Sequence, residues 1–181
     1  FSDMVLAKMK DPTFDATSYL QKINASAQRM SILIKDLLNY SRVNKADQYF
    51  EPVDLNQVLE NVLEDFEVLI RQKNAQLFSS PLPTIMGVPV QLNQLFYNLI
   101  SNALKFSERP PVIKVSARTI ASPDQSTLLP EDAAGHYTEL TFEDNGIGFS
   151  QEYVDKIFTI FQRLNDRQKY NGSGIGLAIC K

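Results

Sequence analysis

Three stretches far apart in the sequence carry side chains that suit nucleotide chemistry. The first is residues 143–148, Glu-Asp-Asn-Gly-Ile-Gly, which follow the apolar alternation of a strand expected over 138–142. Gly146 and Gly148 have no Cβ, so the backbone can reach φ > 0 and another group can approach closely. The carboxylate of Asp144 only accepts hydrogen bonds, which suits the exocyclic amine of adenine. Because Asp-Asn-Gly is also common turn chemistry, this stretch alone leaves an ordinary turn open.

The second stretch is a helix expected over 91–106. At about 100° per residue, its apolar face consists of Leu92, Leu95, Phe96, Leu99, Ala103 and Phe106, and its polar face of Gln91, Asn98, Asn102 and Lys105. Asparagine is a poor residue for a helix interior, so two of them one turn apart indicate a site. An asparagine carbonyl oxygen suits Mg²⁺, and a lysine meets phosphate as a point charge. An ordinary solvated face remains the alternative for this helix by itself.

The third stretch is residues 171–180, a glycine-rich turn that opens an apolar helix. Such a turn offers unpaired N–H groups and the positive end of a helix dipole to phosphate. One glycine-rich turn is a weak signal, whereas three such stretches in this order and spacing are a strong one.

Together these stretches resemble the motifs of sensor histidine kinases. Residues 98–106 are similar to the N box, 144–149 to the G1 box, 157–164 to the F box and 172–177 to the G2 box. The resemblance covers nearly the whole chain. It implies the GHKL (Bergerat) ATP-binding fold, which these kinases share with type II topoisomerase ATPase subunits, mismatch-repair ATPases and the ninety-kilodalton heat-shock chaperone. The expected fold class is α+β: a helical hairpin, forming a four-helix bundle in a dimer, followed by a two-layer α/β sandwich.

The resemblance also implies a role for each site residue. Asp144 would select adenine, and Asn102 would hold Mg²⁺, with Asn98 and Lys105 near the phosphates of ATP. Asn98, Asn102 and Lys105 are therefore the expected catalytic residues. The remaining expected nucleotide-binding residues belong to the glycine turns and the lid: Gly146, Gly148, Arg163, Arg167, Lys169, Gly172, Ser173, Gly174, Ile175, Gly176 and Leu177. Phe158 and Phe161 are expected to anchor the lid by packing.

Two domains are expected, a partial dimerisation hairpin over 1–45 and the ATP-binding domain over 46–181. Apolar residues in a helix from residue 16 to about 44 recur in heptad steps at Leu20, Ile23, Ala27, Met30, Ile34 and Leu37. This pattern favours a helical bundle, and its resemblance to the family's dimerisation hairpin implies a homodimer. A single amphipathic helix folded onto the next domain is the alternative.

The bulk properties exclude several classes of partner. A formal net charge of −3 gives no electrostatic reason to expect nucleic acid or a membrane surface. No apolar run approaches the roughly 20 residues that span a bilayer. Cys180 is the only cysteine, which fits a reducing compartment. We expect a cytoplasmic and bacterial protein, no nucleic-acid partner, and no membrane contact by this segment. The first residue is not Met, so we expect a fragment of a longer chain.

Shorter elements follow from local signals. Residues 49–53 are expected as an extended edge because of Pro52, and Asp54 is expected to cap a helix with Gln57 as capping-box partner. Further strands are expected over 75–79, 112–118 and 137–142, the last two antiparallel. A short helix is expected over 151–158, and the polar lid over 165–171 is expected to be mobile.

The implied function is transfer of the γ-phosphoryl group of ATP to a histidine and then to an aspartate of a response-regulator receiver domain. His136, the only histidine, lies in a loop expected over 121–136, far from helical context. The acceptor histidine is therefore expected before Phe1, and the segment should bind ATP without phosphorylating itself. Two alternatives remain: a degenerate module that senses nucleotide or scaffolds a dimer, and a serine kinase or ATPase of the same fold. The intact Asn and Asp positions argue against the first, and the hairpin argues against the second.

Overall fold

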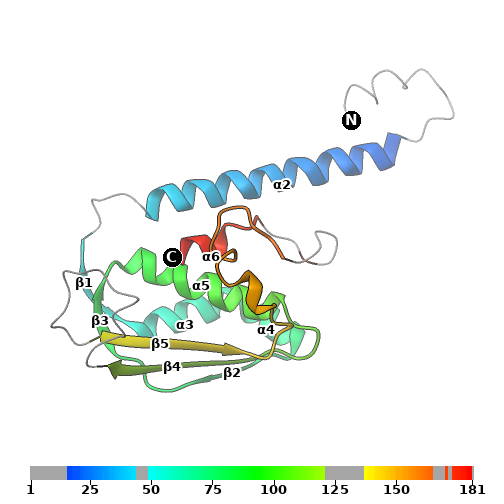
Figure 1. Ribbon diagram of the computed structural model, residues 1–181. Coiled ribbons are helices and arrows are strands. Elements are labelled where there is room, and N and C mark those ends of the chain that lie inside the picture. The colour runs from blue at the N-terminus through cyan, green and yellow to red at the C-terminus, as the bar shows by residue number, and fades with distance from the viewer. Residues whose placement is uncertain (1–15, 44–48, 121–136, 165–169, 171–172, 181) are drawn as a thin grey trace.

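The computed structural model describes residues 16–43, 49–120, 137–164, 170 and 173–180. Within these ranges a long helix, α2 (Ala16–Val43), lies beside a two-layer α/β unit, with helices on one side of a sheet (Figure 1). This arrangement confirms the predicted α+β class and the layered sandwich. The first 15 residues of the expected hairpin lie outside the described residues, and so do the expected domain boundary between residues 45 and 46 and the loop that contains His136.

The main sheet has the order β2-β4-β5. Strand β2 (Gln76–Ser79) runs parallel to β4 (Val112–Ile120), and β4 runs antiparallel to β5 (Tyr137–Asp144) as predicted. Side chains of β4 alternate, with Ile113 and Val115 buried and Lys114 exposed, because only one face of the sheet is covered.

A second, two-stranded sheet pairs β1 (Glu51–Asp54) with β3 (Thr84–Gly87) in antiparallel register. Pro52 lies on this short pair, as the edge prediction required. The sequence analysis did not predict β3. This strand has only four residues, follows Pro83 and ends in Gly87, so it carries almost no periodicity.

The helical layer consists of α3 (Leu55–Asp65), α4 (Glu67–Lys73) and α5 (Pro89–Lys105). The Asp54 side chain caps α3 by accepting a 2.9 Å hydrogen bond from the Asn56 N–H, as predicted. The Gln57 side chain, expected to complete a capping box, donates to Asn61 instead. Helices α3 and α4 are separated at Phe66, whose buried ring lies 4.7 Å from the ring of Tyr97 on α5.

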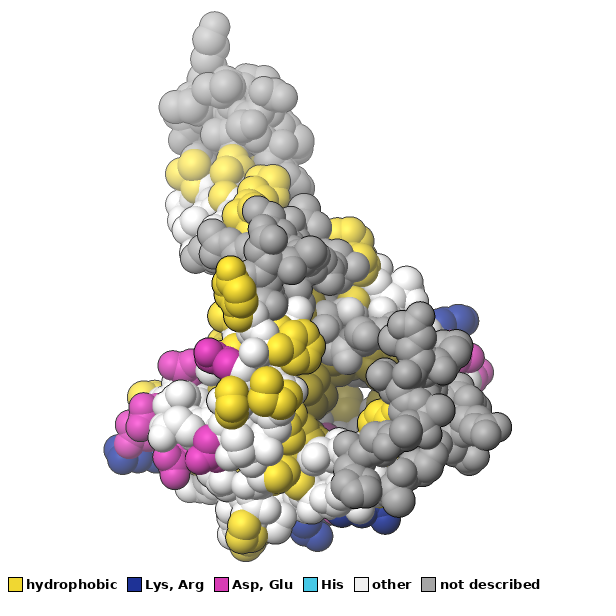
Figure 2. Space-filling model, turned by 90° about the vertical axis from the view of Figure 1, so that its left-hand side faces the viewer, with side chains coloured by type: hydrophobic (Ala, Val, Ile, Leu, Met, Phe, Trp, Pro, Cys, Tyr) yellow, Lys and Arg dark blue, Asp and Glu magenta, His cyan; other side chains and the backbone are white. Residues whose placement is uncertain are grey.

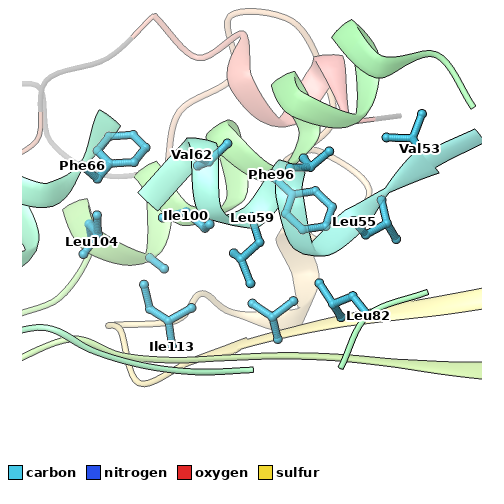
Figure 3. Packing of buried hydrophobic residues seen from close by; sticks show 13 residues of the cluster. Val53, Leu55, Leu59, Val62, Phe66, Leu82, Phe96, Ile100, Leu104 and Ile113 are labelled. Carbon is cyan, nitrogen blue, oxygen red and sulfur yellow. The ribbon is translucent and has the colours of Figure 1, made fainter. Parts of the chain in front are cut away.

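The core lies between this helical layer and the sheet (Figure 3). Helix α5 contributes the fully buried Phe96, Ile100 and Leu104, and α3 contributes Leu55 and Val62. The ring of Phe96 meets that of Phe142 on β5 edge-on, with 5.0 Å between centroids. One face of α5 is thus fixed against the sheet, and this sets the direction of its polar side chains.

One later element is shorter than predicted. The helix expected over 151–158 begins as a single 3₁₀ turn, η1 (Gln151–Tyr153). The helix predicted after the glycine turn is α6 (Gly176–Ile179). Helix α2 contacts α6 (Figure 1). Among the described residues, no helix combines the length and apolarity that crossing a membrane requires.

Candidate nucleotide-binding site

A cavity of about 410 Å³ opens between α5, the end of β5 and residues of the ranges 147–164 and 174–177. This volume is in the range of small-molecule sites. Most of its wall is apolar, and its few polar side chains come from three separate segments. The apolar lining is formed by Leu99, Ala103, Phe106, Ile113, Phe142, Ile147, Phe149, Ile157, Phe158, Leu164 and Leu177.

Asp144 lies at the cavity, at the last position of β5. Its Oδ1 accepts a 2.7 Å hydrogen bond from the Gly146 N–H, so the carboxylate is turned back over its own loop. A Cβ at Gly146 would lie 2.6 Å from that oxygen and 2.7 Å from the Phe106 carbonyl oxygen. The Ile147 N–H donates to the same carbonyl at 2.9 Å. The glycine therefore allows the turn to dock on the C-terminal end of α5.

Asn102 and Lys105 reach the same cavity from α5. The pKa of Lys105 is lowered, first because the ammonium group is partly buried and then because the guanidinium of Arg163 is close. Two cationic side chains beside one apolar cavity disfavour each other until an anion binds between them. This arrangement suits a phosphate group.

Asn98 occupies a different environment from Asn102. Its side chain is buried, its Nδ2 donates to the Gly176 carbonyl oxygen at 3.0 Å, and its Oδ1 accepts from Gln94 at 3.0 Å. The Cys180 thiol donates to the same Gly176 oxygen, and burial raises the pKa of that thiol. Asn98 thus joins α5 to α6. The predicted contact of Asn98 with phosphate stays a prediction. Helical spacing alone did not reveal the hydrogen bond between Asn98 and Gly176, because that bond depends on how α6 packs.

The glycine turn packs against the segment that carries the expected F box. Gly174 has φ 77°, and a Cβ there would lie 2.9 Å from the Gln162 carbonyl oxygen. The Phe161 N–H donates to the Gly174 oxygen at 2.9 Å, whereas the Phe161 side chain is exposed. Phe158 lines the cavity and is 37% exposed, so the anchoring of the lid by these two rings stays a prediction.

Most of the remaining predicted nucleotide-binding residues lie in the described part of the chain, and three lie outside it. Arg163 lines the cavity and donates to the Tyr170 carbonyl oxygen, and the Tyr170 ring lies 5.0 Å from that of Phe106. The Ser173 hydroxyl accepts from the N–H of the fully buried Ile175 at 3.3 Å. Gly148, with φ 63°, and Leu177 line the cavity. Arg167, Lys169 and Gly172 lie outside the described residues.

The sequence analysis did not predict the apolar part of the wall. Leu99 and Ala103 were expected on the face of α5 that packs into the core, and they also line the cavity. Gln162 also reaches the cavity. Ile147 and Phe149, which alternate with the glycines of 146–148, were the available signal for an apolar wall.

A divalent cation at this cavity would need phosphate oxygens of the nucleotide as ligands in addition to protein groups. Within the described ranges no group of three or more His, Cys, Asp and Glu side chains is placed to hold a metal ion. Mg²⁺ usually keeps several waters and binds phosphate oxygens together with one or two protein groups. The Asn102 amide oxygen at the cavity wall fits that requirement.

Residues 87–181 match the family described as histidine kinase-, DNA gyrase B- and HSP90-like ATPases. With the layered fold and this cavity, the match shows that the chain belongs to that family of ATPases.

Two proteins similar to this chain are a phytochrome and a phytochrome-like protein. The chain is 37% identical to cyanobacterial phytochrome A of Nostoc sp. over 168 residues, 92% of this chain and 20% of that protein. It is 33% identical to the phytochrome-like protein Cph1 of Synechocystis sp., over 92% of this chain and 21% of the relative. The chain thus spans about a fifth of the length of these relatives.

Solved structures agree with this placement. The mycobacterial sensor histidine kinase MprB is 26% identical and has a TM-score of 0.53, covering 72% of this chain and 74% of that chain. The fold also matches full-length ShkA in complex with AMPPNP, with a TM-score of 0.62 at 23% identity, over 96% of this chain and 34% of that one. The predicted resemblance to histidine-kinase catalytic domains is confirmed.

Proposed function

We propose that this chain is the ATP-binding catalytic part of a two-component sensor kinase that phosphorylates a histidine. The observation that carries the proposal is the distribution of polar groups around one apolar cavity. Asp144, a hydrogen-bond acceptor, lines the cavity at the end of the sheet. The cavity is also lined by Asn102, whose amide oxygen suits a metal ion, and by the cations Lys105 and Arg163. A flat apolar base with one exocyclic amine, joined to a chain of phosphates, matches that distribution.

Each residue then has a physical task. The Asp144 carboxylate accepts from the adenine amine, and Leu99, Ala103 and Phe142 exclude water around the ring. Lys105 and Arg163 neutralise phosphate charge, and Asn102 supplies one oxygen for Mg²⁺. Asn102 would hold Mg²⁺, whose charge would offset the negative charge that develops on the phosphates during transfer. Phosphoryl transfer requires positioning and charge neutralisation more than covalent chemistry, so this set of residues is sufficient on the nucleotide side.

The acceptor and the downstream partner are also part of the proposal. The kinase ThkA, which shares this fold with a TM-score of 0.61 and 20% identity, was solved in complex with the response regulator protein TrrA. We extend that class of partner to the parent of this chain, together with a phosphorylated histidine outside the present sequence. The cytoplasmic location and the bacterial origin stay predictions.

Titration calorimetry tests the assignment of the nucleotide groups. Asp144→Asn replaces an acceptor with an amide whose N–H₂ faces the adenine amine, which should cost about 2–4 kcal/mol. This corresponds to roughly 30- to 1000-fold weaker ADP binding. Asn102→Ala should leave binding of adenosine and of metal-free ADP unchanged and weaken only the Mg²⁺-dependent part of ATP binding. Normal ADP affinity in Asp144→Asn would contradict the adenine assignment.

A labelling experiment separates a kinase from a module that only binds nucleotide. The present chain should acquire no acid-labile label from ATP with a radioactive γ-phosphate. The full-length parent should acquire it, and Asn102→Ala in that parent should remove it. Nucleotide binding without any label in the parent would support the degenerate module, and acid-labile label on the isolated chain would make His136 the acceptor to examine.

A further inference from the structure

The side chain of Asn145, next to the expected adenine-selecting residue, is bonded at both ends to a distant part of the chain. Its Oδ1 accepts from the Val112 N–H at 2.9 Å, and its Nδ2 donates to the Pro110 carbonyl oxygen at 3.1 Å. An asparagine in an ordinary turn bonds its own backbone two residues on. Asn145 instead uses its amide as a substitute for backbone and extends the β4–β5 pairing past the end of β5.

The main chain of Asn145 is held to the same segment. Its N–H donates to the Val112 carbonyl oxygen at 3.2 Å, and its carbonyl oxygen accepts from two nitrogens of Arg109, each at 3.3 Å. Both the side chain and the main chain are therefore fixed to residues 109–112. The last regular strand pair is that between Ile113 and Asp144, directly before this clamp.

Asp144 therefore lies between two fixed points. On one side Asn145 clamps the chain to the start of β4. On the other side the Ile147 N–H is bonded to Phe106, at the end of the helix that carries Asn102 and Lys105. Asp144 itself is exposed, and packing does not hold its side chain. The direction of its carboxylate is thus determined by the backbone of the turn.

We propose that Asn145 is a positioning residue that aims the Asp144 carboxylate into the cavity and thereby determines the preference for adenine. This inference rests on the proposed function, because it takes Asp144 as the acceptor of the adenine amine. It adds a residue that need not touch the nucleotide. The side-chain amide makes two hydrogen bonds, to residues 110 and 112, that help to hold the turn. Replacing the amide removes these two hydrogen bonds and loosens the turn without altering any residue that lines the cavity.

The test compares ADP with purine riboside 5′-diphosphate, which lacks the exocyclic amine, by titration calorimetry. The unmodified protein should prefer ADP by roughly 10- to 100-fold, the usual effect of one charge-assisted hydrogen bond. Asn145→Ala should reduce this preference to within a few-fold of unity while affinity for the purine nucleotide stays nearly unchanged. In an Asp144→Asn background, Asn145→Ala should cause no further loss of preference.

A second variant covers the case in which Asn145→Ala fails to fold. Asn145→Asp keeps the acceptor for the Val112 N–H but turns a carboxylate oxygen toward the Pro110 carbonyl oxygen, so the ADP preference should fall in this variant as well. Its added negative charge acts on the phosphates of both nucleotides alike and cancels in the ratio. Asn61→Ala, on the exposed face of α3, is the matched control and should leave the ratio unchanged.

The outcomes separate the two proposals. If the unmodified protein does not prefer ADP, the adenine role of Asp144 is wrong and the positioning role fails with it. If the unmodified protein prefers ADP but the Asn145 variants keep that preference, only the positioning role is wrong. A parallel loss of affinity for both nucleotides would also overturn it, because it would show a general structural effect.

Discussion

The two glycines of the Asp144 turn have different physical reasons to be glycine. A Cβ at Gly146 would lie within 2.7 Å of both the Asp144 carboxylate and the backbone oxygen of Phe106, whereas a Cβ at Gly148 would meet nothing within 4 Å. Gly148 needs only its positive φ of 63°. One position is therefore limited by space and the other by backbone conformation.

We predict that Gly146→Ala abolishes measurable ADP binding, because the turn must move away from α5. Gly148→Ala should cost only about 1–2 kcal/mol of stability from the left-handed backbone and should retain ADP binding. Thermal unfolding and calorimetry on the two matched variants check this. Equal losses of ADP affinity in both would contradict the explanation by contact.

The lowered pKa of Lys105 predicts a pH dependence of nucleotide binding. Phosphate favours the charged ammonium, so the pKa of Lys105 should rise on binding from its lowered value toward or beyond the ordinary 10.5. Affinity is then full below the pKa of the free protein and is lost as pH rises through the pKa of the bound form, and protons are taken up in between.

Calorimetry of ADP in buffers of different ionisation enthalpy measures that uptake, at pH values above the pKa of the terminal phosphate of ADP. Adenosine, which has no phosphate, should show no uptake. Lys105→Met should bind ADP more weakly and should lose the uptake. Unchanged proton uptake in Lys105→Met would assign the pH dependence to another group.

At the scale of elements, the contact between α5 and α6 depends on one buried amide. Asn98 donates to the Gly176 carbonyl oxygen. This hydrogen bond joins residues 78 positions apart in the sequence and therefore holds α6 against α5. The same hydrogen bond connects the end of the glycine turn, at Gly176, to α5, and Gly174 of that turn lines the cavity.

We predict that Asn98→Asp releases α6, because a carboxylate oxygen would then face the Gly176 oxygen without a donor. Exchange of the Ile179 and Cys180 amide hydrogens, which bond back to Ile175 and Leu177, should become about 10- to 100-fold faster. Gln57→Glu, at an exposed position of α3, is a matched control and should have no effect on these amides. Unchanged exchange in Asn98→Asp would show that α6 is held by other contacts.

At the scale of the whole molecule, a row of apolar side chains along α2 is uncovered. Leu20, Met30, Ile34 and Leu38 are each more than half exposed, at 55%, 58%, 59% and 53%. Figure 2 shows hydrophobic side chains at the surface of this part of the molecule and on the face below it. Three of the predicted seam positions, Leu20, Met30 and Ile34, are therefore uncovered although α2 contacts α6, and this favours a second copy as their cover.

We predict that the protein is a dimer at micromolar concentration and that Ile34→Glu makes it monomeric, because a charge would be buried in the seam. Gln28→Glu, which introduces the same side chain at an exposed position next to the seam residue Ala27, should remain dimeric. Light scattering gives both masses. A monomeric mass for the unmodified protein would contradict the bundle.

The sequence by itself determined the elements and the motifs. Periods of 3.6 and 2 residues located α2, α3, α5, β4 and β5, because each carries apolar side chains along one face and such a face leaves a repeating pattern. Asp54 as a cap and Asp144 after a strand were readable for the same reason: a local signal specifies a local structure. The choice of residues 98–106, 144–149 and 172–177 as one site came from the family resemblance, and the family match confirms that resemblance.

Only the tertiary structure decided which polar residues share the cavity and which serve as ties between elements. Asn98 and Asn102 have the same residue type and lie on the same face of one helix, yet one bonds to α6 and the other lines the cavity. Asn145, which reads as a turn residue, reaches back to residues 110 and 112. These contacts join residues more than 30 positions apart, and no local periodicity encodes the packing that brings them together.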